Sequence, residues 1–206
     1  MPATPRYSEI RTSTRQYWSL LLLLAILAAV GIGAAHHMDV EGHHISGMNN
    51  QVVWGLPHVF AIFLIVAASG ALNLASIASV FGKVEYKPLA RFSAVLSIAL
   101  LVGGLAVLLL DLGRPDRLIV AMTHYNFKSI FAWNIILYSG FIVIVLAYLW
   151  LMMERRFERW SKPAGMFAFA WRLILTTGTG SIFGFLVARE AYDSALLAPM
   201  FIVMSF

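Results

Sequence analysis

The sequence predicts an all-α integral membrane protein that crosses a bilayer several times as one bundle of packed helices. Sixty per cent of its 206 residues are apolar and only 12% are charged, whereas soluble domains carry roughly 25% charged residues. Several apolar stretches reach the ~20 residues that a membrane-spanning helix needs. Most of the basic residues lie between these stretches rather than inside them. These observations favour a polytopic bundle with about five spans and part of a sixth.

The predicted spans follow one another with short connections. The first four cover residues 17–35, 53–81, 89–110 and 130–153. A fifth, at 165–188, is weaker because Arg172 and the run TTGTGS interrupt it. A sixth begins near residue 195 and is still apolar at Phe206, after about 12 of the ~20 residues that a span requires. We therefore expect a chain truncated at its C-terminus, with a tail at 1–16 and a single membrane domain at 17–206. The alternative for the last segment is a short re-entrant or interfacial helix.

The positions of lysine and arginine predict the orientation of the spans. Basic residues occur in the N-terminal tail, between the second and third spans and after the fourth, whereas the loop after the first span has none. By the positive-inside rule the basic segments are cytoplasmic. The N-terminus is then on the cytoplasmic side of a bacterial inner membrane, and the loop after the first span is extracytoplasmic.

Composition excludes several kinds of site and partner. The chain has no cysteine, so it can form no disulfide and can bind no Cys-ligated iron–sulfur cluster or zinc ion. Its net charge of +5 comes from residues at the flanks of the spans. Membrane topology and anionic lipid explain that charge better than nucleic acid does.

The polar run at residues 36–58 carries the strongest functional signal. It places five of the six histidines, two acids and two adjacent asparagines between two apolar segments. Ionisable side chains are costly near hydrocarbon, so such a cluster at a membrane boundary indicates a functional site. Histidine changes its charge between about pH 5 and 8. The run therefore predicts proton-linked chemistry at the edge of the bilayer.

Three kinds of site can be weighed for this run. A metal site is disfavoured because adjacent histidine pairs on a glycine-containing loop match no fixed ligand spacing. A b-type haem needs two histidines on facing helices at matching depth, and His58 is the one histidine expected inside a span. A quinone pocket needs an apolar slot, an aromatic wall and hydrogen-bonding groups near water. Residues of these types are Asp39, His43, His44, Asn49, Asn50, Trp54 and His58, with Arg114, His124, Tyr125 and Trp133 from the loop at 111–133. Interfacial aromatic anchors beside solvated loop histidines remain the alternative interpretation.

Five segments of the chain resemble the NrfD/PsrC family, the integral membrane subunits of polysulfide-reductase-type respiratory complexes. They are GMNNQVVWGLPHVFAIFLIVAASGALNLASIASVFG (47–82), YKPLAR (86–91), LDLGRPDR (110–117), SIFAWN (129–134) and REAYDSALLAPMFI (189–202). Within the family the chain resembles the DsrP subunits of sulfur-oxidation and sulfite-reduction complexes. Members usually have eight or more spans in two bundles, so this chain is similar to the N-terminal part, with the first four-helix bundle nearly whole.

The resemblance implies a haem-free subunit without a catalytic centre that exchanges electrons between menaquinone or ubiquinone and an extracytoplasmic partner. That partner is a ferredoxin-like iron–sulfur subunit, and it serves a catalytic subunit, often a molybdenum enzyme, in anaerobic respiration or sulfur metabolism. The family's quinone site lies near the extracytoplasmic face. The residues expected at the quinone ring are His43, Asn50, Trp54, His58, Tyr125 and Trp133, and those expected to transfer protons are Asp39 and His44. Asp111, Arg114 and Arg117 are interpreted as a structural ion-pair knot at the partner-facing edge.

Two other functions fit parts of the sequence. A secondary transporter would place its site at the bilayer midplane on broken helices, and the run TTGTGS at 176–181 allows such a break. A passive anchor would hold a soluble enzyme at the membrane without binding quinone. The polar cluster at the edge of the spans favours the quinone-linked subunit over both.

Overall fold

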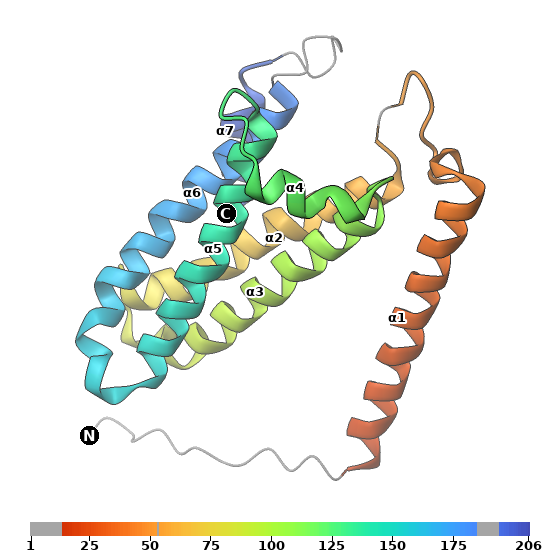
Figure 1. The fold of residues 1–206 in the computed structure, drawn as a ribbon. Coiled ribbons are helices and arrows are strands. Elements are labelled where there is room, and N and C mark those ends of the chain that lie inside the picture. The colour runs from red at the N-terminus through yellow and green to blue at the C-terminus, as the bar shows by residue number, and fades with distance from the viewer. Residues whose placement is uncertain (1–13, 53, 185–193) are drawn as a thin grey trace.

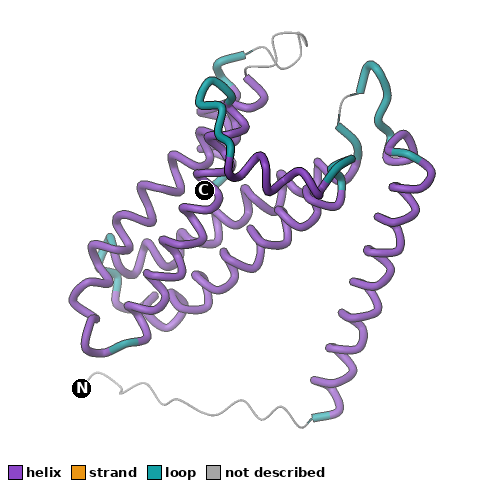
Figure 2. Tube along the Cα trace, in the orientation of Figure 1, coloured by secondary structure: helices purple, strands orange, loops and turns teal. Residues whose placement is uncertain are grey.

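The computed structural model describes residues 14–52, 54–184 and 194–206, and helices account for all regular secondary structure in these ranges (Figure 2). The five long helices are α1 (Arg15–Glu41), α2 (Leu56–Ser79), α3 (Lys87–Leu110), α5 (Ile130–Met153) and α6 (Ser161–Gly184). The shorter elements are η1 (His43–Ser46), η2 (Val84–Tyr86), η3 (Pro115–Arg117), α4 (Leu118–Thr123), η4 (Arg155–Trp160) and α7 (Leu197–Met204).

Four of the long helices, α1, α2, α3 and α5, are long and apolar enough to cross a membrane. They correspond to the first four predicted spans, and the all-α polytopic membrane fold is confirmed. Helix α6 has 24 residues, as many as α2, but its polar interruptions leave it outside this group among the described helices. Residues 185–188, the predicted end of the fifth span, lie outside the described residues. The predicted sixth span contains α7, which is eight residues long.

Helices α2, α3, α5 and α6 form a four-helix bundle. Helix α2 packs on α3, α3 on α5, α5 on α6, and α6 returns to α2, while α7 packs mainly on α6 (Figure 1). Helix α1 stands apart from the bundle in Figure 1, and the most apolar window of this helix buries none of its residues. The four-helix bundle expected from the family resemblance is therefore built without α1.

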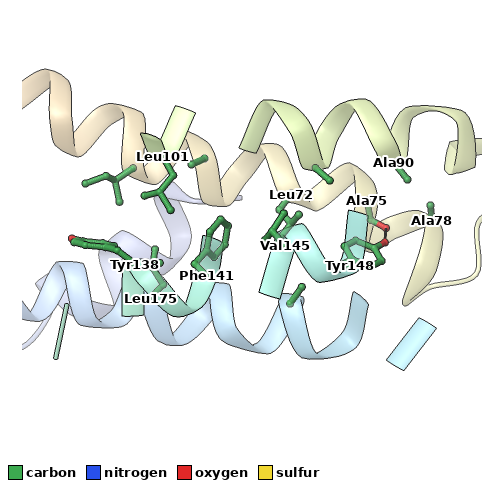
Figure 3. Packing of buried hydrophobic residues seen from close by; sticks show 14 residues of the cluster. Leu72, Ala75, Ala78, Ala90, Leu101, Tyr138, Phe141, Val145, Tyr148 and Leu175 are labelled. Carbon is green, nitrogen blue, oxygen red and sulfur yellow. Dashed lines mark hydrogen bonds between the residues drawn. The ribbon is translucent and has the colours of Figure 1, made fainter. Parts of the chain in front are cut away.

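The bundle core combines apolar side chains with hydroxyl groups that hydrogen-bond to backbone carbonyls (Figure 3). The Ser93 hydroxyl on α3 donates to the carbonyl oxygen of Ala71 at 2.5 Å. The Tyr148 hydroxyl on α5 lies 3.0 Å from the carbonyl oxygen of Ala75 and 2.7 Å from Ser79 Oγ. Small residues on α2 allow these approaches, and such partners satisfy polar groups that hydrocarbon could not.

The segment between α3 and α5 contains two short helices that the sequence did not predict. Element η3 and helix α4 run from the end of α3 to the start of α5 (Figure 1). Helix α4 leaves Ile119 and Val120 exposed. This connection closes the end of the bundle at which α2 begins and α3 ends, and the candidate site lies there.

Candidate functional site

Three glycine or proline positions shape the backbone that leads into the site. Gly42 ends α1 with φ +99°, a conformation that glycine adopts without steric cost. A Cβ atom on Gly55 would overlap Ser46 Oγ and lie 2.8 Å from the Ser46 carbonyl oxygen, so only glycine permits η1 to approach the start of α2 this closely. Pro57 then occupies the first turn of α2, where its missing N–H costs no hydrogen bond. The run WGLPH thus folds η1 against the end of the helix that carries His58.

His58 and Asp111 form the centre of the site. The Nδ1 atom of His58, in the first turn of α2, lies 2.5 Å from Oδ2 of Asp111, which directly follows α3. The approach is close, but it is misaligned for a hydrogen bond, so both carboxylate oxygens of Asp111 lack a hydrogen-bond donor among the described residues. We treat the contact as an electrostatic pair.

The Asp111 side chain is fully buried, whereas 21% of the His58 side chain is exposed. A buried carboxylate with unused hydrogen-bond capacity is energetically costly, and at a membrane boundary it indicates a functional site. Because Nδ1 of His58 faces the carboxylate, Nε2 points to the other side of the ring, where no described residue hydrogen-bonds to it. The pair therefore combines a partly exposed imidazole with a buried carboxylate whose oxygens receive no hydrogen bond from the described residues.

His43 connects η1 to the same aspartate. Its Nε2 atom lies 3.0 Å from the backbone carbonyl oxygen of Asp111. A carbonyl oxygen only accepts hydrogen bonds, so Nε2 of His43 carries the proton. This bond joins residues 68 positions apart in the chain and holds the loop before α2 against the end of α3.

An aromatic wall lies beside the pair. The Trp54 ring is 6.1 Å from the His58 ring and 4.7 Å from the Phe183 ring, between centroids. Phe183, near the end of α6, stacks in turn on Phe201 of α7 at 5.3 Å. Both phenylalanines are buried. The site thus has the apolar and aromatic side that binding pockets for planar ring ligands require.

Three of the predicted residues are exposed. Asp39 is exposed in the last turn of α1, the helix that stands apart from the bundle. His44 and Asn50 are exposed in the connection between α1 and α2. The neighbouring Asn49 accepts hydrogen bonds from the backbone N–H groups of Gln51 and Val52 and so shapes a local turn.

Tyr125 and Trp133 belong to a separate aromatic group. Both rings lie about 6 Å from the Phe127 ring, at 6.0 Å and 5.9 Å between centroids. Both residues are exposed, and the Trp133 indole donates to the Phe127 carbonyl oxygen at 2.9 Å. The structure shows no contact between this group and His58 among the described residues.

The predicted ion-pair knot is not formed. Among the described residues the Asp111 carboxylate contacts His58 and neither Arg114 nor Arg117, and both arginines are exposed. The physical reason is that the Asp111 side chain is buried at the end of α3, whereas Arg114, directly before η3, and Arg117, at its end, are both exposed.

Two residues gain a role that the sequence analysis did not give them. Asp111 was grouped with the arginines, although an acid that directly follows an apolar span on the same side as His58 was a usable signal. Phe183 was not singled out at all, because a phenylalanine in an apolar helix carries no signal of its own. Its position beside Trp54 depends on how α6 packs against α2.

In chemical terms the site can exchange protons with a small ring ligand. Among the described residues no three histidine, aspartate or glutamate side chains are arranged to hold a metal ion. An imidazole paired with a carboxylate can accept a proton from a hydroxyl group, since the carboxylate stabilises the imidazolium that forms. The aromatic wall lies beside this imidazole, with the Trp54 ring 6.1 Å from the His58 ring.

Comparisons with known proteins agree with this fold. The family model described as polysulphide reductase, NrfD, matches residues 44–206. The chain is 32% identical over 200 residues to the Hdr-like menaquinol oxidoreductase integral membrane subunit of Archaeoglobus fulgidus, an alignment that covers 96% of this chain and 49% of that protein.

Two further relatives are more distant. A putative dimethyl sulfoxide reductase membrane subunit of Halobacterium salinarum is 29% identical, with 87% of this chain and 46% of that protein covered. A selenate reductase subunit of Mesobacillus selenatarsenatis is 23% identical, with 88% and 51% covered. The chain thus spans about half the length of these relatives. With a family model that matches most of its length and four helices able to span a membrane, this multi-pass membrane chain belongs to the polysulphide reductase NrfD family.

Proposed function

We propose that this chain is a haem-free, quinone-interacting membrane subunit of a respiratory oxidoreductase complex, with its quinone site at His58 and Asp111. The observation that carries the proposal is the buried Asp111 carboxylate, which lies 2.5 Å from the His58 ring and receives no hydrogen bond from the described residues. A quinol hydroxyl beside this pair can donate a hydrogen bond and would use acceptor capacity that the protein leaves unmet.

Similarity supports quinone as the ligand. The relative from Archaeoglobus fulgidus is named as a subunit of a menaquinol oxidoreductase, and the other two are named as subunits of selenate and dimethyl sulfoxide reductases. A membrane subunit shared by reductases with different terminal substrates fits a role at the common quinone pool.

The residues of the site suggest how quinol oxidation would proceed. Oxidation of one quinol to quinone releases two protons and two electrons. Nε2 of His58 would accept the two protons in turn, passing the first to water at the exposed part of its ring before it accepts the second, and Asp111 would stabilise the imidazolium that forms each time. His43 would keep the end of α3, and thus Asp111, in register with His58. Trp54 and Phe183 would hold the ring and keep water away from its face.

The electrons need an acceptor outside this chain, since a protein without cysteine has no Cys-ligated cluster of its own. We propose a ferredoxin-like iron–sulfur subunit as that acceptor, docked at the bundle end that carries α4, Arg114 and Arg117. A catalytic subunit would complete the complex. By the positive-inside rule this end is extracytoplasmic and the N-terminus is cytoplasmic.

The alternative functions are a secondary transporter and a passive anchor. Helices α2, α3 and α5 are continuous across their lengths, whereas transporters place their sites on broken helices at the midplane. A passive anchor would leave the pairing of His58 with Asp111 without consequence for electron transfer. Substitution of His58 separates these functions.

The experiment compares His58→Gln with a matched control, His37→Gln, in the intact complex. His37 is exposed on α1. We expect His58→Gln to lower quinol-linked turnover by about a hundredfold, the lower range for loss of a general base, and to leave turnover with a soluble artificial electron donor unchanged. His37→Gln should change neither rate. Quinol-linked turnover that survives in His58→Gln would refute the proposed site and leave a passive anchor or a transporter.

A further inference from the structure

A cavity with charged, hydroxyl and apolar side chains in its lining lies at the end of the bundle opposite to His58 and Asp111. It has a volume of about 80 Å³ and is lined by residues from all four bundle helices and η4, among them Ser79, Lys87, Arg91, Tyr148, Glu158 and Ser161. A single water needs roughly 10–15 Å³ by this measure. The cavity can therefore admit a polyatomic group.

The cavity is positively charged. Lys87 and Arg91 lie one turn apart on the first turns of α3, and like charges at this spacing repel each other. Glu158 compensates only weakly, because its carboxylate is 3.5 Å from Lys87 Nζ and both side chains are more than half exposed. Arg91 Nη2 donates to the Met152 carbonyl oxygen at 2.9 Å, which fixes the guanidinium at the cavity. An anion between the two cations would relieve their repulsion.

The surroundings of the cavity are also basic. The two connections that meet at this end, residues 83–91 and 154–162, contain seven lysines and arginines and three glutamates. Clusters of this kind at one membrane surface attract anionic lipid headgroups.

An apolar stripe continues from the two cations along the same face of α3. Val95, Ile98 and Val102 follow Arg91 at helical spacing. Val95 and Val102 are each about half exposed, at 51% and 49%. A ligand that fits both features carries an anionic group at one end and an apolar chain that extends toward the middle of the membrane.

We propose that this cavity is a binding site for the phosphodiester headgroup of an anionic phospholipid. Lys87 and Arg91 contact the phosphate through charge-assisted hydrogen bonds. One acyl chain lies along Val95 and Val102. The site is independent of the proposed quinone site, because it lies at the other end of the bundle and shares no residue with it.

The test measures lipid retention by the intact complex. The complex is purified in detergent, supplemented with phosphatidylglycerol or phosphatidylcholine, and examined by mass spectrometry under non-denaturing conditions. The variant Lys87→Gln/Arg91→Gln is compared with the control Lys83→Gln/Arg159→Gln, which removes the same charge from the same end outside the cavity lining. We expect the first variant to lower phosphatidylglycerol affinity about tenfold or more, the control to lower it less than threefold, and phosphatidylcholine to bind weakly throughout.

Two single variants extend the test in case the double variant folds poorly. Arg91→Lys keeps the charge and should retain most of the affinity, and Lys87→Gln alone leaves the Arg91 contact with Met152 in place and should lose part of it. Equal losses in the cavity and control variants would overturn the proposal in favour of general surface attraction. Displacement of the lipid by inorganic phosphate at equal concentration would overturn it in favour of a soluble anion.

Discussion

The Nδ1 atom of His58 lies 2.5 Å from Oδ2 of Asp111, and the two residues come from the start of α2 and the end of α3. The backbone carbonyl of the same aspartate accepts a hydrogen bond from His43. Three residues that are spread over 69 positions of the chain thus share one end of the bundle. This arrangement leads to four predictions about the site and its support.

Asp111→Asn should lower quinol-linked turnover by about a hundredfold, because an amide cannot stabilise the imidazolium that forms when His58 accepts a proton. The substitution keeps the shape of the side chain, so the fold should persist. The matched control is Asp116→Asn, since Asp116 is exposed in η3. Steady-state rates with quinol and with an artificial donor test this prediction, and equal rates for the two variants with quinol would contradict it.

His43→Ala should have a smaller effect than Asp111→Asn. It removes one hydrogen bond, worth about 0.5–1.5 kcal/mol, so the affinity for a quinone analogue should fall by about two- to thirteenfold. His43 holds the backbone of Asp111 in place and is not expected to contact the quinone ring. Without its hydrogen bond, amide hydrogen exchange at residues 111–114 should become faster. The exposed His44, changed to alanine, provides the control. If His44→Ala produced the larger loss, the assignment of His43 as a positioning residue would be wrong.

Gly55→Ala should separate η1 from the start of α2. The added methyl group would overlap Ser46 Oγ and press against the Ser46 carbonyl, and such overpacking costs about 1–3 kcal/mol. Thermal unfolding of the purified complex and affinity for a quinone analogue should both decrease. At Gly33 in α1 a methyl group meets nothing within 4 Å, so Gly33→Ala should leave both unchanged or raise stability slightly. Similar melting temperatures for the two variants would show that the contact does not constrain the loop.

Trp54 should report on ligand binding through its fluorescence. Its ring lies 6.1 Å from the His58 ring and 4.7 Å from the Phe183 ring, so a bound quinone analogue should quench it. We expect saturable quenching that is largely lost in Trp54→Phe and retained in Trp150→Phe, since Trp150 lies near the far end of α5. Quenching that persists in Trp54→Phe would place the ligand elsewhere.

Several features of the fold could be predicted because they depend on composition and local sequence. Uninterrupted apolar runs of about 20 residues predict α1, α2, α3 and α5 directly, since the bilayer leaves few alternatives to a helix. The weakness of the fifth span was also visible, because Arg172 and the run TTGTGS lower its hydrophobicity. Within the functional site, His58, His43 and Trp54 could be named as candidates because polar and aromatic residues are unusual beside an apolar span.

The partners of these residues could be identified only from the tertiary structure. Asp111 is one of several acids at the ends of spans, and nothing local to it distinguishes a bond to Arg114 from a contact with His58. The choice follows from the packing of α2 against α3, which brings the start of one beside the end of the other. Likewise, Asp39 has a suitable side chain but lies on α1, the helix that stands apart from the bundle in Figure 1.

The sequence alone therefore determined that the chain is a helical membrane protein, where its first four spans lie, and which end of the bundle carries polar chemistry. Those properties follow from the free energy of transferring each segment from water to hydrocarbon, which depends only on the residues of that segment. The tertiary structure decided which polar groups meet, which remain in solvent, and that Phe183 closes the aromatic wall beside Trp54. These are contacts between segments distant in the chain, and their geometry depends on how helices pack, which no single segment encodes.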